Sequence, residues 1–277
     1  MHSDTSVLAS NRDEFLERPT ARADWWDIPH THILGPRDLK AGVNGTWIGI
    51  SKRGHMAFLT NNHEMGSPVT NKRTRGLLVH DFLVDDQVSP ADYLTRLLPE
   101  GQLYNGFNLV VGDLCRTAFY AGSNHTRNDD NEKDDTSTLS LEPLPLDQVL
   151  GLSNADLGTP QDWPRVQRGV MVMTEILGQQ LAREALIEEL FTMLRDSSPF
   201  TPTNLPQTVE EARKPICLPP IQLHQQWYGT GVSTVILVDH DNHVYYSERE
   251  LVTQDGAPVS EPGRTFEFMI DPEPATN

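Results

Sequence analysis

Short, mainly apolar runs of strand length predict antiparallel β-hairpins in this chain. Three pairs of such runs are each separated by only four residues: 46–50 with 55–60, 107–112 with 117–121, and 233–238 with 243–247. The connections 51–54 and 239–242 contain good turn formers. A further strand is predicted over residues 265–270. Antiparallel sheets are therefore the expected basis of the fold.

Two segments have helical periodicity instead. Ser89 is a typical N-cap, Pro90 suits the first turn of a helix, and the leucines that follow share one face. Over residues 184–195, apolar side chains form a single stripe, and Pro199 ends this second helix. Because hairpins and amphipathic helices occupy separate blocks, the pattern favours an α+β fold over alternating βαβ units.

The chain, residues 1–277, is expected to form a single domain whose core spans about 6–270. Residues 124–138 are rich in charged side chains that cannot be buried together, so we expect a surface loop there. A second long connection, rich in proline and polar residues, is predicted at 199–220. The longest apolar runs are strand-sized, and no membrane span is predicted.

The charge, the cysteines and the first residues of the chain limit which partners and which cellular location are expected. The net charge of −17, from 39 acidic and 22 basic side chains, repels phosphates and excludes nucleic acid as an expected partner. The only cysteines, Cys115 and Cys217, are too far apart for a metal-binding CxxC pair, and we interpret them as reduced thiols. The polar first residues lack the pattern of a secretory signal, so a cytoplasmic protein is expected.

The densest polar run, Asn11–Glu14, directly follows an apolar strand predicted at residues 6–9. A strand end of this composition is either a capped turn or a functional site. Composition alone favours the turn, because asparagine and aspartate are common turn formers.

This run resembles the signature of the NRDE family, the transport and Golgi organisation 2 family, which is named for Asn-Arg-Asp-Glu. The resemblance covers residues 7 to about 247, because further blocks follow in the family's order: 34–39, 45–49, 59–61, 74–76, 104–109, 151–154 and 228–230. It implies a four-layer αββα sandwich similar to the N-terminal nucleophile hydrolases. In those enzymes an N-terminal cysteine attacks an amide carbonyl, and its own α-amino group is the base.

The resemblance also implies a pocket. Arg12 and Asp13 are similar to the arginine and aspartate that flank the nucleophile in those hydrolases. Asn61 resembles an oxyanion-hole asparagine and Asn154 a second asparagine that faces the substrate, and Asn11 completes the candidate pocket. The alternatives are a turn or cap for each asparagine, and a structural ion pair at a strand end for Arg12 with Asp13.

The start of the chain departs from the family. Family members usually begin Met-Cys and have a strand ahead of the one that reaches Asn-Arg-Asp-Glu, whereas this chain begins Met1-His2 only ten residues before Asn11. The nucleophile is therefore absent, and no residue is assigned as catalytic. If the opening strand is missing, the sheet should have an unpaired edge beside residues 6–9.

A second departure is Gly231, at a position where the family commonly has an arginine. We expect anion recognition to be lost there, because no lysine or arginine lies within ten residues on either side.

The resemblance implies a protein of Golgi organisation and protein secretion that handles a small molecule, either haem or an acyl lipid, without catalysis. Its expected partners are that ligand and proteins of the secretory pathway, and its location is cytoplasmic, Golgi-associated or mitochondrial. The alternative is an N-terminal-cysteine hydrolase acting on C–N amide bonds, if the true start carries Met-Cys. Neither a cofactor nor a metal site is expected, but His55 or His63 would matter in a haem carrier.

Overall fold

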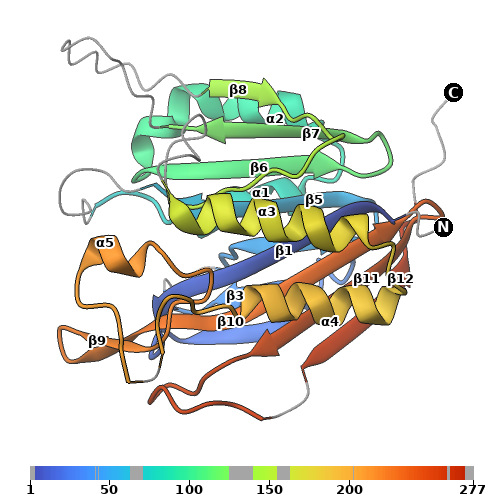
Figure 1. The fold of residues 1–277 in the computed structure, drawn as a ribbon. Coiled ribbons are helices and arrows are strands. Elements are labelled where there is room, and N and C mark those ends of the chain that lie inside the picture. The colour runs from blue at the N-terminus through green and yellow to red at the C-terminus, as the bar shows by residue number, and fades with distance from the viewer. Residues whose placement is uncertain are drawn as a thin grey trace, which may run out of the picture. The chain divides into compact units, whose positions relative to one another are not determined.

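The computed structural model describes residues 4–40, 42, 44–62, 71–124, 140–154, 163–201, 203–260 and 263–271. Their contacts divide the chain into two compact units, each with one antiparallel sheet and helices packed on it (Figure 1). Unit 1 comprises Met1–Arg18, Val149–Gly151 and Gln161–Met269, and unit 2 comprises Pro19–Gln148, Leu152–Pro160 and Ile270–Asn277. The α+β class is confirmed, whereas the single domain and the stacking of four layers stay predictions.

The sheet of unit 2 has seven antiparallel strands in their chain order. They are β2 (Thr20–Trp25), β3 (Ile33–Asp38), β4 (Ile48–Ser51), β5 (His55–Asn61), β6 (Phe107–Asp113), β7 (Ala118–Ser123) and β8 (Ser140–Pro143). Gly54 closes the turn between β4 and β5 with a φ of +91°, which glycine adopts without strain. The hairpins predicted from residues 46–60 and 107–121 are confirmed.

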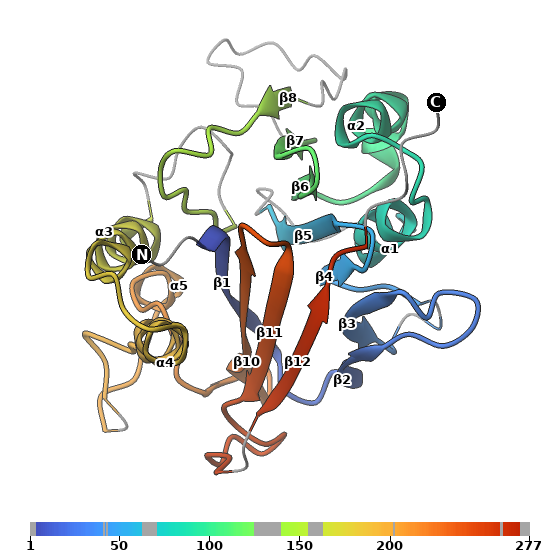
Figure 2. The same cartoon turned by 90° about the vertical axis from the view of Figure 1, so that its right-hand side faces the viewer.

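Helices α1 (Gly76–Val84) and α2 (Pro90–Leu97) lie along one face of this sheet (Figure 2), and the 3-10 helix η1 (Leu98–Leu103) follows α2. Helix α1 contacts β3 to β6, and α2 contacts β6 to β8. Ser89 caps α2 as predicted, because its Oγ accepts a hydrogen bond from the Asp92 backbone N–H at 3.1 Å. The core beneath these helices includes Phe82, Leu94 and Phe107, each with no exposed surface.

The sheet of unit 1 has five strands: β1 (Asp4–Phe15), β9 (Ile221–Leu223), β10 (Gln226–Asp239), β11 (His243–Glu250) and β12 (Arg264–Met269). Its order is β1-β10-β11-β12, and β9 pairs with the first residues of β10. Helices α3 (Pro164–Gly178) and α4 (Arg183–Leu194) pack on each other, and α4 also lies against β1 and β10. The predicted hairpin 233–247, strand 265–270 and helix 184–195 are confirmed.

Strand β1 is an edge of the unit 1 sheet, since β10 is the only described strand that pairs with it. Every residue from Ser6 to Phe15 is half-buried, whereas most of β10 is buried. The edge expected beside residues 6–9 is therefore present in the described part of the chain. The placement of Asn11–Glu14 after the strand was wrong: this run forms the second half of β1, because pairing with β10 continues as far as Phe15 and Tyr228.

Two predicted connections have different outcomes. Apart from Asn124, the charged loop predicted at 124–138 lies outside the described residues. The connection predicted at 199–220 contains one short helix, α5 (Val209–Ala212). In the described ranges, no helix has the length and apolar character that crossing a membrane requires.

Replacing Phe82 with alanine should destabilise the protein by about 3–5 kcal/mol, because the change leaves a cavity under α1 in the fully buried core of unit 2. Chemical denaturation followed by circular dichroism measures this loss. The control is Leu39→Ala in the same unit, where the side chain is half exposed and the change should stay within about 0.5 kcal/mol. Equal effects of the two substitutions would contradict the assigned core.

His55 should make the stability of the protein depend on pH. Burial lowers the pKa of His55 from its ordinary value of 6.5, and the ring stacks on Phe82 with centroids 4.7 Å apart. The unfolded chain therefore binds the proton more readily, so the contribution of neutral His55 is complete above pH 6.5 and is lost as the pH falls below it. We expect the free energy of unfolding to fall less between about pH 7.5 and pH 5 in His55→Gln than in the unmodified chain. The exposed His240→Gln serves as control and should keep the original pH dependence.

Candidate functional site

The polar run of β1 faces a bulge in the neighbouring strand β10. Asn11 pairs with Ser233 and Arg12 with Val232, but Asp13 pairs with Thr230, so Gly231 is an extra residue on β10. The Gly231 carbonyl accepts a hydrogen bond from the Leu251 N–H at 2.9 Å. The bulge is thus held by its backbone.

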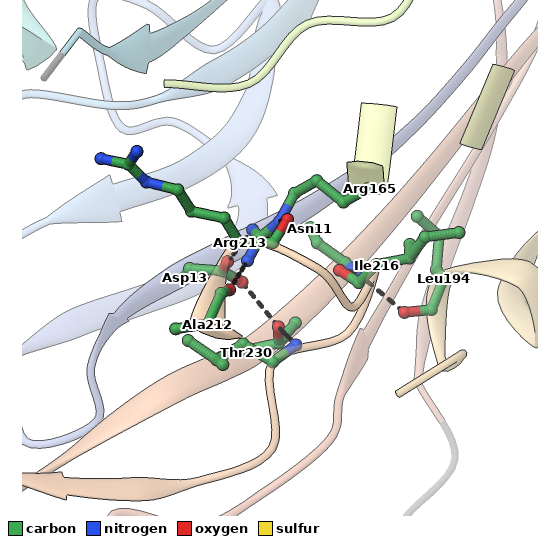
Figure 3. Close-up of polar contacts among 9 residues, drawn as sticks. Asn11, Asp13, Arg165, Leu194, Ala212, Arg213, Ile216 and Thr230 are labelled. Carbon is green, nitrogen blue, oxygen red and sulfur yellow. Dashed lines mark hydrogen bonds and ion pairs between the residues drawn. The ribbon is translucent and has the colours of Figure 1, made fainter. Parts of the chain in front are cut away.

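Asn11 connects β1 to two other segments of unit 1 (Figure 3). Its Nδ2 donates to the carbonyl oxygens of Leu194 at 2.8 Å and Ile216 at 3.0 Å, and its Oδ1 accepts from Ser233 Oγ at 2.6 Å. Leu194 is the last residue of α4, where carbonyl oxygens lack partners within the helix. Both amide hydrogens of Asn11 are therefore committed to the fold.

Asp13 is the centre of a closed polar network in the same unit. Its Oδ2 lies 2.6 Å from Arg165 Nη1, and its Oδ1 accepts from Thr230 Oγ1 at 2.6 Å. Thr230 Oγ1 in turn accepts from the Leu218 N–H at 2.8 Å. The ion pair is largely shielded from water, with 14% of the Asp13 side chain and 15% of the Arg165 side chain exposed.

Arg165 also holds the end of α5. Its Nη2 donates to the Ala212 carbonyl and its Nε to the Arg213 carbonyl, the latter at 3.3 Å. Arg165, near the start of α3, thus forms an ion pair with Asp13, and the sequence did not suggest this partner. Burial raises the pKa of the nearby Tyr228 above its usual range, while the charges of Arg165 and Arg12 act in the opposite direction. A pairing of Arg12 with Asp13 stays a prediction.

Cys217 lies beside this network. Burial raises the pKa of its thiol to about 11, although a hydrogen bond with Thr230 acts in the opposite direction. Burial also raises the pKa of Cys115. Because the thiolate is the reactive form of cysteine, these shifts reduce the thiolate fraction of both residues near neutral pH.

Asn61 and Asn154 belong to unit 2. Asn61 is the exposed last residue of β5, and the residue before it, Thr60, donates its hydroxyl to the Ser153 carbonyl at 2.8 Å. Asn108 Nδ2 strengthens this connection by donating to Thr60 Oγ1 at 3.1 Å and to the Ser153 carbonyl at 3.3 Å. Asn61 follows Thr60 in the sequence and Asn154 follows Ser153, so the two candidate asparagines flank the same hydrogen bond. A common pocket with Asn11, Arg12 and Asp13 stays a prediction.

Together the fold and this cluster define an α+β protein with two antiparallel sheets and a fixed polar network at the end of β1. The sequence matches the family described as Transport and Golgi organisation 2 over residues 5–253, and the chain belongs to this family.

Similar proteins extend over nearly the whole chain. The Transport and Golgi organization protein 2 homolog of Bos taurus is 36% identical, with 95% of this chain and 92% of the relative aligned. The homolog of Homo sapiens is 33% identical over the same shares. Among solved structures, the chain resembles a Caenorhabditis elegans ortholog of N-acylethanolamine-hydrolyzing acid amidase, with a TM-score of 0.48 and 15% identity. That alignment covers 85% of this chain and 90% of the other.

Replacing Asp13 with asparagine should destabilise the protein by about 3 kcal/mol, because it leaves the shielded Arg165 guanidinium without a counter-charge. Urea denaturation measures the change. The matched control is Glu100→Gln, which breaks the exposed ion pair with Arg73 and should change stability far less than Asp13→Asn does. If both substitutions have the same small effect, the Asp13 network does not stabilise the fold.

Proposed function

We propose that this chain is a small-molecule-binding protein of transport and Golgi organisation that acts in protein secretion and holds its ligand without consuming it. The names of its relatives support the cellular process, since four of them, including the Drosophila melanogaster protein, are named for transport and Golgi organisation. The ligand is a molecule of the size of an acyl lipid or haem.

The observation that carries the non-catalytic part of this proposal is the state of the two thiols. Covalent catalysis on an amide or thioester needs an activated nucleophile, and burial raises the pKa of both Cys115 and Cys217. Asp13 lies beside Cys217 but is committed to Arg165 and Thr230. Neither thiol therefore has the activation that covalent turnover would need, which favours binding of the ligand over its hydrolysis.

Of the two ligand types, we favour an acyl lipid, because one of the two histidines considered for haem is poorly placed to bind iron. Haem ligation requires an imidazole that can reach the iron, whereas only 5% of His55 is exposed and its ring is stacked on Phe82. His63, the other histidine considered for haem, lies outside the described residues. A haem titration of the purified chain should therefore leave the Soret band of free haem unshifted.

The decisive experiment compares binding with turnover. The purified chain is incubated with a fluorogenic N-acyl amide and with an acyl thioester, and product release is followed beside equilibrium binding of the same compounds. We expect saturable binding, with product release no faster in the unmodified chain than in Asn61→Ala. Hydrolysis that Asn61→Ala abolishes would overturn the proposal in favour of a hydrolase.

The cellular part has a separate test. Cells that lack the protein should show altered Golgi morphology and slower secretion, and expression of the unmodified chain should restore both. The variant Asn61→Ala, Asn154→Ala removes two candidate ligand contacts and should restore neither, provided that immunoblotting shows equal abundance. Full rescue by the variant would show that the cellular role does not require ligand contacts of Asn61 and Asn154.

A further inference from the structure

Arg213 has a fixed backbone position next to the Asp13 network. It directly follows α5, its N–H donates to the Glu210 carbonyl at 3.2 Å, and its own carbonyl accepts from Arg165 Nε at 3.3 Å. Figure 3 shows its side chain extending away from Asp13. The Arg213 side chain is therefore anchored at its base but takes no part in the ion pair.

Two features of the Arg213 guanidinium suit it to bind a ligand: its orientation by an aromatic ring and an unpaired N–H donor. It lies over the ring of the buried Trp163, 4.8 Å from the ring centroid, so an aromatic face orients the planar group. Its Nε is buried and has no hydrogen-bond partner among the described residues. A buried charged donor without an acceptor is costly, so a bound acceptor would relieve this cost.

Among the described residues, no carboxylate forms an ion pair with Arg213. Arg165 also faces Trp163, at 5.9 Å, but its charge is paired with Asp13. Both carboxylate oxygens of Asp13 are occupied. In a chain with a net charge of −17, a half-buried arginine that keeps an open donor is a distinct local feature.

We propose that Arg213, stacked on Trp163, binds an oxyanion of the ligand, either a carboxylate or a phosphate. This inference rests on the proposed small-molecule binding and names the group that the ligand must carry. In the family an arginine is common at the position of Gly231 on β10, and its absence here led us to expect that anion recognition is lost. In the present proposal Arg213, from the connection before β9, supplies the guanidinium instead. Its planar group can donate to two oxygen atoms of one oxyanion.

The test uses three probes with the same alkyl chain on the complete protein: octanoate, octyl phosphate and the uncharged octan-1-ol. Isothermal titration calorimetry at low salt gives each affinity. The unmodified chain should bind at least one of the two anions about tenfold or more tightly than octan-1-ol. The preferred anion distinguishes a carboxylate ligand from a phosphate ligand.

Arg213→Gln should reduce the affinity for that anion to the level of octan-1-ol and leave octan-1-ol binding unchanged. Arg213→Lys keeps the charge but loses the fork, so it should fall between the two. The matched control is Arg183→Gln, because Arg183 also stacks on an aromatic ring, Tyr245 at 4.0 Å, but is paired with Glu184. This control should bind all three probes like the unmodified chain, and circular dichroism verifies that each variant is folded.

Two results overturn the inference and have different meanings. In the first, the unmodified chain binds the anions no more tightly than octan-1-ol, or Arg213→Gln binds the anions as tightly as the unmodified chain does. Either finding refutes the oxyanion site at Arg213, while small-molecule binding stands. If none of the probes binds the unmodified chain, the inference fails together with the acyl form of the proposed function.

Discussion

The ion pair between Asp13 and Arg165 is the interaction on which the candidate site in unit 1 depends. It joins the edge strand β1 to the start of α3, and through Thr230 it fixes the bulged part of β10. The other donors of Arg165 hold the end of α5 and so place Arg213. In the partly shielded interior, removal of either charge leaves the other uncompensated, so these segments are coupled through one interaction.

Much of the fold was predictable because its signals are local. Helices α2 and α4 follow from apolar periodicity and, for α2, from the Ser89 cap, and three hairpins follow from paired apolar runs joined by short connections. Helix α1 was missed because its sequence is apolar nearly all round and no side chain caps it. Strands β2 and β3 were also missed, because β2 is rich in polar residues and Pro36 lies within β3.

The site was less predictable because its contacts join distant positions. The sequence identified Asn11 and Asp13, but Arg165 is separated from Asp13 by 152 positions and Thr230 by 217. No local pattern marks Arg165, which follows Pro164 at the start of a helix that the sequence did not reveal. The family resemblance supplied the Tyr228-Gly229-Thr230 block, yet only the coordinates show that the Thr230 hydroxyl contacts Asp13.

The bulge at Gly231 does not depend on the side chain at that position. Its carbonyl bond to Leu251 involves no side chain, and a Cβ there would meet only Leu16 Cδ2, at 3.3 Å. An alanine at this position therefore needs only a small shift of one flexible leucine. The side chain at position 231 can consequently change with little effect on the pairing of β1 with β10, because that pairing and the bulge are held by backbone atoms.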